Sequence, residues 1–340
     1  MTMTSTTTRP SGLIAIEAEM ARQHADALAS FERATPLAHD IATSLKRTGR
    51  LLLLGMGGSH AVSRAVEPLY RNLGIDALAL PLSEQLGQPL TVSDRTVLMT
   101  SQSGESAEVL RWFGEASAQT DVFGLTLEGG SSLARLAPSL IGAGGTEHAF
   151  AATRSLTVTF ALHLAVLSAL GMDAAPALAV LKQPQDPNIE IALQAMAKVA
   201  TIVTSGRRLQ GVAEAIALGL TELSRLPCFS LEGGQLRHGP MEMLGENVGV
   251  VLFRANDETS ALVAGMATSA QEAGSPVVVF DASGEKPVPN VVTISLAAAS
   301  GMAAIFAILP VAQRFMVSFA AGRVADVGTP IRSTKITRSE

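Results

Sequence analysis

Apolar runs and helical patterns alternate along the first half of the chain. We expect strands at residues 50–55, 77–82, 95–100, 121–125 and 139–143, with helices at 61–73 and through Glu108 and Phe113. Strands that are apolar throughout and alternate with helices indicate a parallel sheet covered by helices on both faces. Residues 49–145 are therefore predicted to form a doubly wound α/β domain of about five strands.

The same order of elements returns over residues 199–296. Strands are expected at 200–204, 248–253, 276–280 and 291–296, with a helix at 211–223 and a short strand ending at 230–232. The two passes also share a strand-end pattern, Leu-Ser-Glu-Gln-Leu at 82–86 against Ser-Leu-Glu at 230–232 followed by Gln-Leu at 235–236. Such a repeat predicts a tandem duplication of one flavodoxin-like sheet.

The repeat divides the chain into three segments. Residues 1–36 would comprise a flexible tail without a secretory signal, over 1–10, and a helix at about 13–31 that packs on a neighbouring domain or subunit. Residues 37–182 would be the first domain and 188–340 the second, with the proline-bearing segment 183–187 between them. Residues 155–170 and 296–312 are apolar but shorter than the roughly 20 residues of a membrane span, so we expect buried core helices.

Composition narrows the class of protein. Of the 340 residues, 47% are apolar and 16% are charged, and the net charge is −5. This balance does not provide the basic surface that nucleic-acid binding requires. Cys228 is the only cysteine, so no intrachain disulfide can form, and the six scattered histidines give no metal-binding motif. We expect a cytoplasmic protein that acts on a small molecule without a metal or cofactor, and that has neither nucleic acid nor a membrane as a partner.

The segment from Thr100 to Ser106, Thr-Ser-Gln-Ser-Gly-Glu-Ser, follows an apolar strand and opens a helix. Its hydroxyl groups and glycine gather where backbone N–H groups lack helical partners and the helix dipole is positive, which suits a phosphate. A simple N-cap would use one hydroxyl and leave the others unexplained. In the second half Asp257 and Glu258 stand in the corresponding loop and would repel a phosphate, so one such site per chain is expected.

A glycine-rich turn, Gly55-Met56-Gly57-Gly58-Ser59-His60, follows the first strand. His60 stands where the dinucleotide fingerprint G-x-G-x-x-G requires glycine, so a nicotinamide cofactor is not expected. A structural turn and a sugar-binding loop both fit, and His60 would either contact ligand or cap the helix.

Two residues of the second half could move protons. His238 lies between Arg237 and a Gly-Pro turn, and the pKa of an imidazole suits proton transfer, although a solvated loop histidine is the simpler interpretation. Glu222 lies among leucines, where burial would raise the pKa of its carboxyl group, although a surface glutamate on an amphipathic helix fits as well. The residues alone indicate a phosphate-binding two-domain α/β protein and leave the reaction open.

These motifs together resemble the sugar isomerase (SIS) family, in particular the two-domain isomerase half of glucosamine-6-phosphate synthase and its stand-alone relatives. The base glutamate of that family lies sixteen residues before the histidine of its His-Gly-Pro motif, and Glu222 and His238 have this spacing. Ala151 to Ser155 is similar to the family's Ala-Ser-Thr-Lys-Ala segment. The residues that resemble its sugar and phosphate loops are Gly57, Gly58 and Ser59, and Ser101, Gln102, Ser103, Gly104 and Glu105, followed by Ser106 in place of the usual threonine.

The resemblance implies a fold of two tandem SIS domains and a role for each residue. Glu222 would move a proton between C1 and C2 of an open-chain sugar 6-phosphate held by the serine loop. His238, contributed by the partner subunit of a homodimer with a shared active site, would assist ring opening and acid catalysis. The closing segment 329–340 is similar to the family's C-terminal tail, which implies that Lys335 reaches the active site.

Departures from the family's pattern narrow the expected activity. The chain has no cysteine near its start that could serve a glutamine-hydrolysing domain, so glutamine-dependent amination is not expected. Ala215 and Gly219 stand where synthases and many deaminases carry a glutamate and a lysine, which resembles the deglycases that split 6-phosphorylated sugar–amine adducts. The leading hypothesis is a ketosamine-6-phosphate deglycase or an amino-sugar-6-phosphate deaminase or isomerase. The alternatives are an aldose–ketose isomerase of phosphosugars and a non-catalytic phosphosugar sensor.

Overall fold

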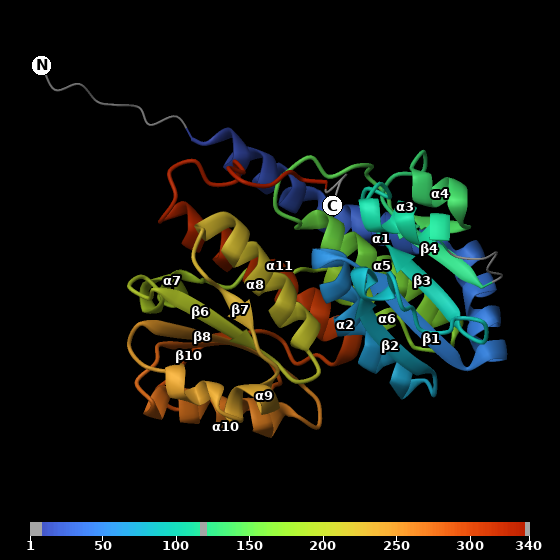
Figure 1. Cartoon of the computed structure of the whole chain (residues 1–340). Helices are drawn as coiled ribbons and strands as arrows, with labels where there is room; N and C mark the ends of the chain where they lie inside the picture. The colour runs from blue at the N-terminus through green and yellow to red at the C-terminus, as the bar shows by residue number, and fades with distance from the viewer. Residues whose placement is uncertain (1–8, 116–120, 337–340) are drawn as a thin grey trace, which may run out of the picture.

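Two five-stranded parallel sheets form the framework of the protein (Figure 1). The computed structural model describes residues 9–115 and 121–336. The strand orders are β2-β1-β3-β4-β5 and β10-β9-β8-β6-β7. Counted from its own first strand, the second sheet has the same order as the first, so the predicted tandem repeat of a flavodoxin-like α/β sheet is confirmed. Residues 1–8 of the predicted tail and 337–340 of the predicted closing segment lie outside the described residues.

Among the described residues, the first lobe comprises 9–115 and 121–182. Its strands are β1 (Arg50–Gly55), β2 (Asp76–Pro81), β3 (Thr96–Thr100), β4 (Val122–Thr126) and β5 (Ser139–Ile141). Its helices are α1 (Ser11–Thr48), α2 (Gly57–Asn72), α3 (Ala107–Glu115), α4 (Ser132–Leu136), α5 (Arg154–Ala169) and α6 (Ala175–Lys182), with a 3-10 turn η1 (Leu82–Gln85).

The second lobe follows a connection without helix or strand at residues 183–189. Its strands are β6 (Thr201–Ser205), β7 (Phe229–Ser230), β8 (Val248–Ala255), β9 (Val277–Ala282) and β10 (Val292–Ser295). Its helices are α7 (Glu190–Ala195), α8 (Gln210–Ser224), α9 (Gly233–Arg237), α10 (Ser260–Glu272) and α11 (Gly301–Ala321), with a 3-10 turn η2 (Pro240–Met243). Domain limits at 37–182 and 188–340 remain a prediction.

Helix α1 is longer than the sequence pattern suggested. We expected it to end near residue 31, before Pro36, yet it continues through this proline to Thr48. The buried stripe continues past the proline as Ala38, Ile41 and Leu45. Because this stripe packs on α5 and the first sheet, burial of apolar surface sustains the helix beyond a residue that disfavours it. The helix therefore packs mainly within its own lobe, while its first turn touches the backbone of Gly328 in the second lobe, as the expected packing on a neighbouring domain required.

Helix α11 is long and apolar enough to cross a membrane, but 89% of its most apolar window is buried inside the protein. It contacts α8, α6 and α5 and lies between the lobes (Figure 1). The expectation of buried core helices is confirmed for α5 and α11. Helix α11 begins at Gly301 and not near residue 296 as expected, because β10 and the segment after it occupy residues 292–300.

The two lobes meet where α2 crosses α8. A Cβ on Gly211 would overlap the backbone of Ala61 and Ala65, so glycine allows the two helix backbones to touch. Gly57, at the start of α2, in turn faces the side chain of Leu218 on α8. This crossing fixes the start of α2 in the first lobe against the middle of α8 in the second, one turn before Glu222.

Candidate active site

A cavity of about 500 Å³ opens at the carboxyl ends of β1 and β3, where the strand order of the first sheet reverses. Ligands of open parallel sheets bind at such switch points. The cavity brings together residues from both lobes and from the end of the described chain. Its lining includes nearly every site residue that the sequence indicated, namely Gly57, Gly58, Ser59, Ser101, Gln102, Ser103, Ser106, Glu222 and Lys335.

The serine loop between β3 and α3 has a rigid backbone. Gly104 has a φ of 66°, and a Cβ there would overlap the hydroxyl group of Ser131, so the loop needs glycine at this position. The hydroxyl groups of Ser101 and Ser106 share a hydrogen bond of 3.0 Å. The carboxylate of Glu105 accepts hydrogen bonds from the backbone N–H of Ser132 (2.7 Å) and from its hydroxyl (2.9 Å), which ties the loop to α4.

Three buried polar atoms of the cavity wall lack a hydrogen-bond partner among the described residues. They are Thr100 Oγ1, Gln102 Nε2 and Glu108 Oε2. Buried polar groups are nearly always paired in folded proteins, so unpaired atoms at a cavity mark places where a polar ligand or water completes the bonding. The cavity is therefore prepared for a polar molecule beside the serine loop.

The glycine-rich turn after β1 also borders this cavity. Ser59 is buried, and its backbone N–H donates to the carbonyl of Met56 at 3.0 Å. The neighbouring His60 does not line the cavity, and burial lowers the pKa of its imidazole. Of the two interpretations of this turn, ligand contact thus fits Gly57, Gly58 and Ser59 and does not fit His60.

Glu222, on the last turn of α8, faces the same cavity from the second lobe. Burial raises the pKa of its carboxyl group from 4.5 to about 7, while Lys335 lowers the pKa and Glu147 raises it. A carboxyl group with a pKa near neutrality can act as a general base at physiological pH.

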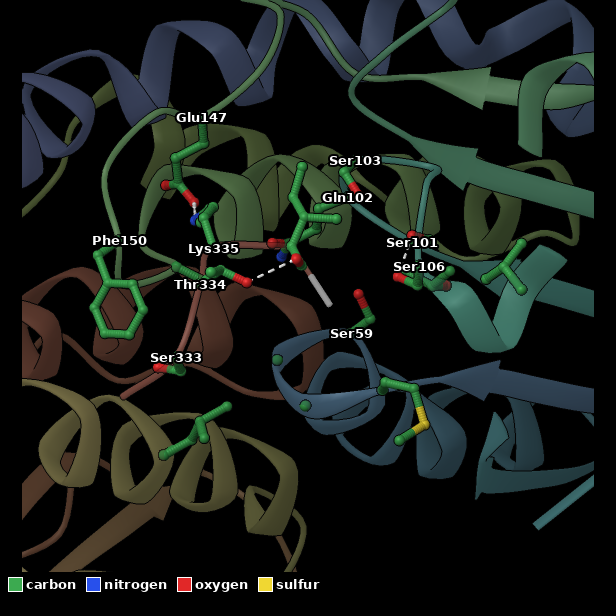
Figure 2. A pocket seen from close by; sticks show the side chains of 18 of the residues that line it. Ser59, Ser101, Gln102, Ser103, Ser106, Glu147, Phe150, Ser333, Thr334 and Lys335 are labelled. Carbon is green, nitrogen blue, oxygen red and sulfur yellow. Dashed lines mark hydrogen bonds and ion pairs between the residues drawn. The ribbon is translucent and has the colours of Figure 1, made fainter. Parts of the chain in front are cut away.

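Lys335 enters the cavity on the closing segment and pairs with Glu147 (Figure 2). Its ammonium group donates to Glu147 Oε2 at 2.9 Å. Glu147 is 2% exposed and also accepts hydrogen bonds from the backbone N–H groups of Thr153 (3.0 Å) and Ser155 (3.1 Å) at the start of α5. One buried carboxylate thus satisfies free N–H groups of a helix and holds the closing segment in place.

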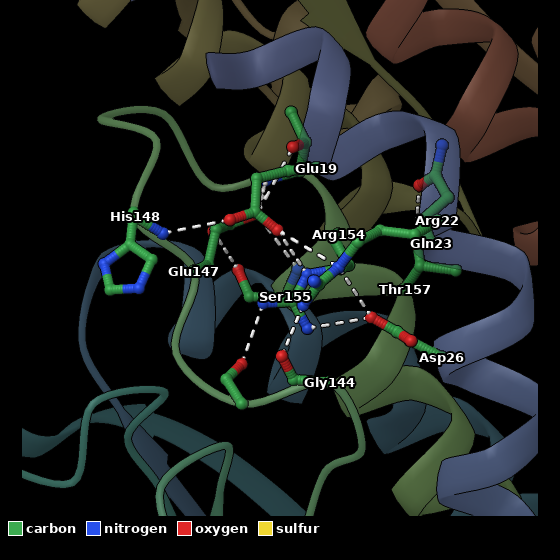
Figure 3. A network of polar contacts seen from close by, with 12 residues as sticks. Glu19, Arg22, Gln23, Asp26, Gly144, Glu147, His148, Arg154, Ser155 and Thr157 are labelled. Atoms are coloured by element: carbon green, nitrogen blue, oxygen red, sulfur yellow. Dashed lines mark hydrogen bonds and ion pairs between the residues drawn. The ribbon is translucent and has the colours of Figure 1, made fainter.

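A buried ion network supports the loop that carries Glu147 (Figure 3). The guanidinium of Arg154 is fully buried between the carboxylates of Glu19 and Asp26 on α1, and it donates to the carbonyl of Gly145 at 2.8 Å. Glu19 accepts a further hydrogen bond from the backbone N–H of His148 at 3.0 Å. Burial raises the pKa of Glu19, but its bonds to Arg154 and His148 outweigh this and hold the pKa below its usual value. The network fixes residues 144–148 against α1.

His238 lies outside the cavity. It follows α9 as an exposed residue of the second lobe and does not line the site within this chain. The segment around it was expected to be a loop, but Gly233–Arg237 form a short helix because the Glu232 carboxylate caps it, accepting from the backbone N–H groups of Gly234 (2.7 Å) and Gln235 (3.2 Å).

In the second lobe, the loop that corresponds to the serine loop uses its own carboxylates to bond neighbouring groups. Asp257 accepts hydrogen bonds from the backbone N–H (2.7 Å) and hydroxyl (2.6 Å) of Thr259, and Glu258 pairs with Arg208. The carboxylates that were expected to repel a phosphate thus satisfy local donors themselves.

Sequence reasoning missed Glu147, Glu108 and Phe150, which all line the cavity. Glu147 precedes the helix it caps by several residues, outside the usual capping pattern, so its role appears only once the loop is folded. Glu108 resembled an ordinary acidic residue in the first turn of a helix.

Part of the chain matches a known domain family. The family model of the SIS domain matches residues 195–322. Glutamine–fructose-6-phosphate aminotransferase (isomerizing) from Streptococcus mutans is 26% identical over 245 residues, which are 65% of this chain and 40% of that enzyme. The chain thus spans well under half the length of this curated relative.

Solved structures share the fold over almost the whole chain. The C-terminal domain of glucosamine-fructose-6-phosphate aminotransferase from Francisella tularensis has a TM-score of 0.75 at 17% identity, covering 93% of this chain and 98% of that one. Tagatose-6-phosphate ketose/aldose isomerase from Escherichia coli has a TM-score of 0.77 at 21% identity, with coverages of 93% and 95%. Glucosamine-6-phosphate deaminase from Thermotoga maritima has a TM-score of 0.70 at 18% identity, with coverages of 92% and 99%. Residues 195–322 therefore match the SIS domain, both lobes have the fold of these solved structures, and the chain is similar in sequence to part of glutamine–fructose-6-phosphate aminotransferase.

Proposed function

We propose that this protein is a cytoplasmic enzyme that moves a proton between C1 and C2 of an open-chain sugar 6-phosphate. The observation that carries the proposal is that the serine loop of one lobe and Glu222 of the other face one cavity. The names of its relatives point the same way, since they include a tagatose-6-phosphate isomerase and a glucosamine-6-phosphate deaminase. A sugar sensor would not need a carboxylate of raised pKa beside its ligand.

The phosphate would bind at the serine loop. The hydroxyl groups of Ser101, Ser103 and Ser106 and the amide of Gln102 surround the start of α3, where the helix dipole is positive. Ser59, Gly57 and Gly58 would contact the sugar. Glu222 would then lie beside the far end of the open chain, close to Lys335.

Within this class we favour a deglycase that splits a ketosamine 6-phosphate. Synthases and many deaminases carry a lysine at the position of Gly219, but here a Cβ at this position would overlap the Met316 side chain of α11. Ala215 is likewise buried, with 4% exposed. Both positions thus hold small residues in a closely packed part of α8, and neither supplies the charge that characterises those enzymes.

The reaction can be written without any redox step. Glu222 takes the proton from C1, the electron pair of that bond forms a C1–C2 double bond, and the carbonyl oxygen at C2 takes a proton, which gives an enaminol. Return of a proton to C2, with the nitrogen lone pair forming the C1–N double bond, gives a protonated imine at C1. Water then adds to C1, the C–N bond breaks, and the amine leaves with a proton, so that one water molecule is consumed and an aldose 6-phosphate remains. General acid–base groups contribute about 10² to 10⁴ in rate each.

His238 could act as the acid only if a second subunit supplies it, because it lies outside the cavity of its own chain. We therefore propose a homodimer with shared active sites. Mixing the inactive variants Glu222→Gln and His238→Ala should restore about a quarter of the wild-type activity, because half of the dimers would be mixed and each would hold one intact site. No restored activity would contradict this assembly.

The test of the proposed function is a panel of hexose 6-phosphates, 2-amino sugars and amine adducts. Proton exchange at C1 or C2 is followed by NMR in D₂O, and amine release by a coupled assay. We expect exchange with the wild type and binding without exchange for Glu222→Gln. Exchange that persists in this variant would refute the proposal.

The aldose–ketose isomerase is the second candidate. It needs the same base and no leaving amine, and the isomerase from Escherichia coli has the same fold. Ketose formation without amine release from any adduct in the panel would favour it.

A further inference from the structure

The short helix α9 determines where the imidazole of His238 lies. It contains only the five residues Gly233–Arg237, and His238 is the residue that ends it. A helix of this length is not stable by itself, so contacts with the rest of the second lobe must hold it in place. The position of His238 therefore depends on those contacts.

The first turn of α9 is held by an ion pair between Arg207 and Glu232. The guanidinium of Arg207, which follows β6, donates to Glu232 Oε1 at 2.8 Å, and both side chains are partly buried. The other oxygen, Glu232 Oε2, is the one that caps the helix. The backbone N–H of Gly233 also donates to the carbonyl of Gly206 at 3.1 Å. One carboxylate thus joins α9 to the loop after β6.

Two glycines let the side chain of Arg207 lie directly on the backbone of α9. A Cβ on Gly233 would lie 2.9 Å from Nε of Arg207, and a Cβ on Gly234 would lie 3.0 Å from its Nη1. A larger residue at either position would push the guanidinium away from the helix. The Gly-Gly pair therefore belongs to the same arrangement as the ion pair.

The remaining contacts of α9 attach it without fixing its orientation. Leu236 is fully buried in the apolar core of the second lobe, but hydrophobic contact is non-directional. Arg237 adds one long hydrogen bond, 3.4 Å, to Ser269 Oγ. The bonds of Glu232 are shorter and directional, so they set the orientation of the helix.

Arg207 itself lies where the second sheet has no space for a ligand. The strand order of this sheet reverses between β6 and β8, as the order of the first sheet does at the active-site cavity. The hollow at this point is lined by Arg207 together with Ser205, Gly233 and Leu252, and it is too small to hold a water molecule. The charge of Arg207 therefore acts on Glu232 and not on a bound anion.

We propose that Arg207 is a positioning residue for the active site of the partner subunit. Through Glu232 and α9 it holds His238 at the place and angle from which this imidazole protonates the sugar bound by the partner. The inference rests on the proposed function and the proposed homodimer, and it adds a residue that does not line the active-site cavity. Arg207 and Glu222 of one chain then serve different active sites.

Arg207→Met tests this role because it removes the charge and keeps most of the length of the side chain. We expect kcat to fall by about 10²-fold, the loss that a displacement of about 1 Å can cause. KM should change by less than about twofold, because the serine loop lies in the other lobe. Arg207→Lys can still donate to Glu232 and should recover kcat to within about tenfold of the wild type. The probes are proton exchange into fructose 6-phosphate and amine release from fructosamine 6-phosphate.

Arg208→Met is the matched control. Arg208 is exposed and pairs with the exposed Glu258, away from α9, so this variant should keep the kcat and KM of the wild type. Glu232→Gln keeps an oxygen that can cap α9 but loses the charge, and it replaces Arg207→Met in the test if urea unfolding shows that Arg207→Met folds poorly.

Mixed dimers distinguish positioning in the partner from a structural role within one chain. When Arg207→Met is mixed with Glu222→Gln, each mixed dimer keeps one site with an intact Glu222 and a correctly held His238, so about a quarter of the wild-type activity should return. When Arg207→Met is mixed with His238→Ala, every site has a missing or displaced imidazole, and no activity should return. If Arg207 served the site of its own chain, the two results would be exchanged.

Return of activity with Glu222→Gln alone supports the inference. Any other pattern overturns it, as does an unchanged kcat in Arg207→Met. If Glu222→Gln and His238→Ala do not restore each other, the shared-site homodimer is wrong and the inference with it, while loss of exchange in Glu222→Gln still supports the proposed base. If the wild type turns over neither probe, the proposed function is overturned as well.

Discussion

The raised pKa of Glu222 predicts a pH-dependent cost to stability that can be measured without a substrate. Glu222→Gln replaces a partly buried carboxyl group by an amide of nearly the same shape. In the wild type the folded state holds the proton of Glu222 more tightly than the unfolded state does. The folded state therefore loses stability as the pH rises from about 4.5 to beyond about 7, where both states are ionised.

The magnitude follows from the pKa values. A rise from 4.5 to about 7 corresponds to about 3 kcal/mol, at about 1.4 kcal/mol per pKa unit. Because part of the side chain reaches solvent, we expect the variant to be about 1–3 kcal/mol more stable than the wild type at pH 8 and equally stable near pH 4.5.

The assay is urea unfolding of both proteins between pH 4.5 and pH 8. Glu272→Gln, which removes an exposed carboxylate of α10, controls for the change in net charge and should show no such trend. A free-energy difference between Glu222→Gln and the wild type that is the same at both ends of the pH range would refute the assignment of a raised pKa to Glu222.

Three further predictions concern the surroundings of this residue. Lys335→Met removes the charge that lowers the pKa of Glu222, so the rise of activity with pH should move above pH 7; an unchanged pH profile of kcat/KM would show that Lys335 does not act on Glu222. Glu19→Gln leaves buried Arg154 without one of its two carboxylates and should lower the free energy of unfolding by about 3 kcal/mol in urea, with a loss below about 1 kcal/mol counting against a tightly coupled network. Gly104→Ala should weaken binding of inorganic phosphate by about tenfold in calorimetry, because both φ and Ser131 oppose a Cβ, whereas Gly114→Ala in α3, where a Cβ has open space, should leave it unchanged.

The repeated sheet could be predicted because its strands are buried on both faces. Segments such as 51–55 and 248–253 are apolar throughout, and this pattern can be recognised without knowing how the segments pack. The serine loop and Glu222 could be found for a related reason. The serine loop follows a strand, and Glu222 lies on a helix, whose positions the repeat predicts. Their meeting in one cavity depends on the α2–α8 crossing, which no local pattern of the sequence expresses.

The parts that could not be predicted depend on contacts between distant segments. Helix α1 runs through Pro36 because α5 and the first sheet bury its far half, so local helix propensity gave the wrong end. Glu147 becomes important only because Lys335, 188 residues later, pairs with it. The location of His238 in an assembled site depends on a second subunit and stays a prediction.

The glycine contact between α2 and α8 also has a mechanical consequence. Backbones in direct contact leave no space for the lobes to come closer at that point, and moving them apart would break close packing. The spacing between the anion-binding loop and the carboxylate is then a fixed property of the scaffold, and the short segment of Ser333, Thr334, Lys335 and Ile336 completes the wall of the cavity. Ordering four residues to complete a cavity wall costs little conformational entropy compared with closing two whole lobes.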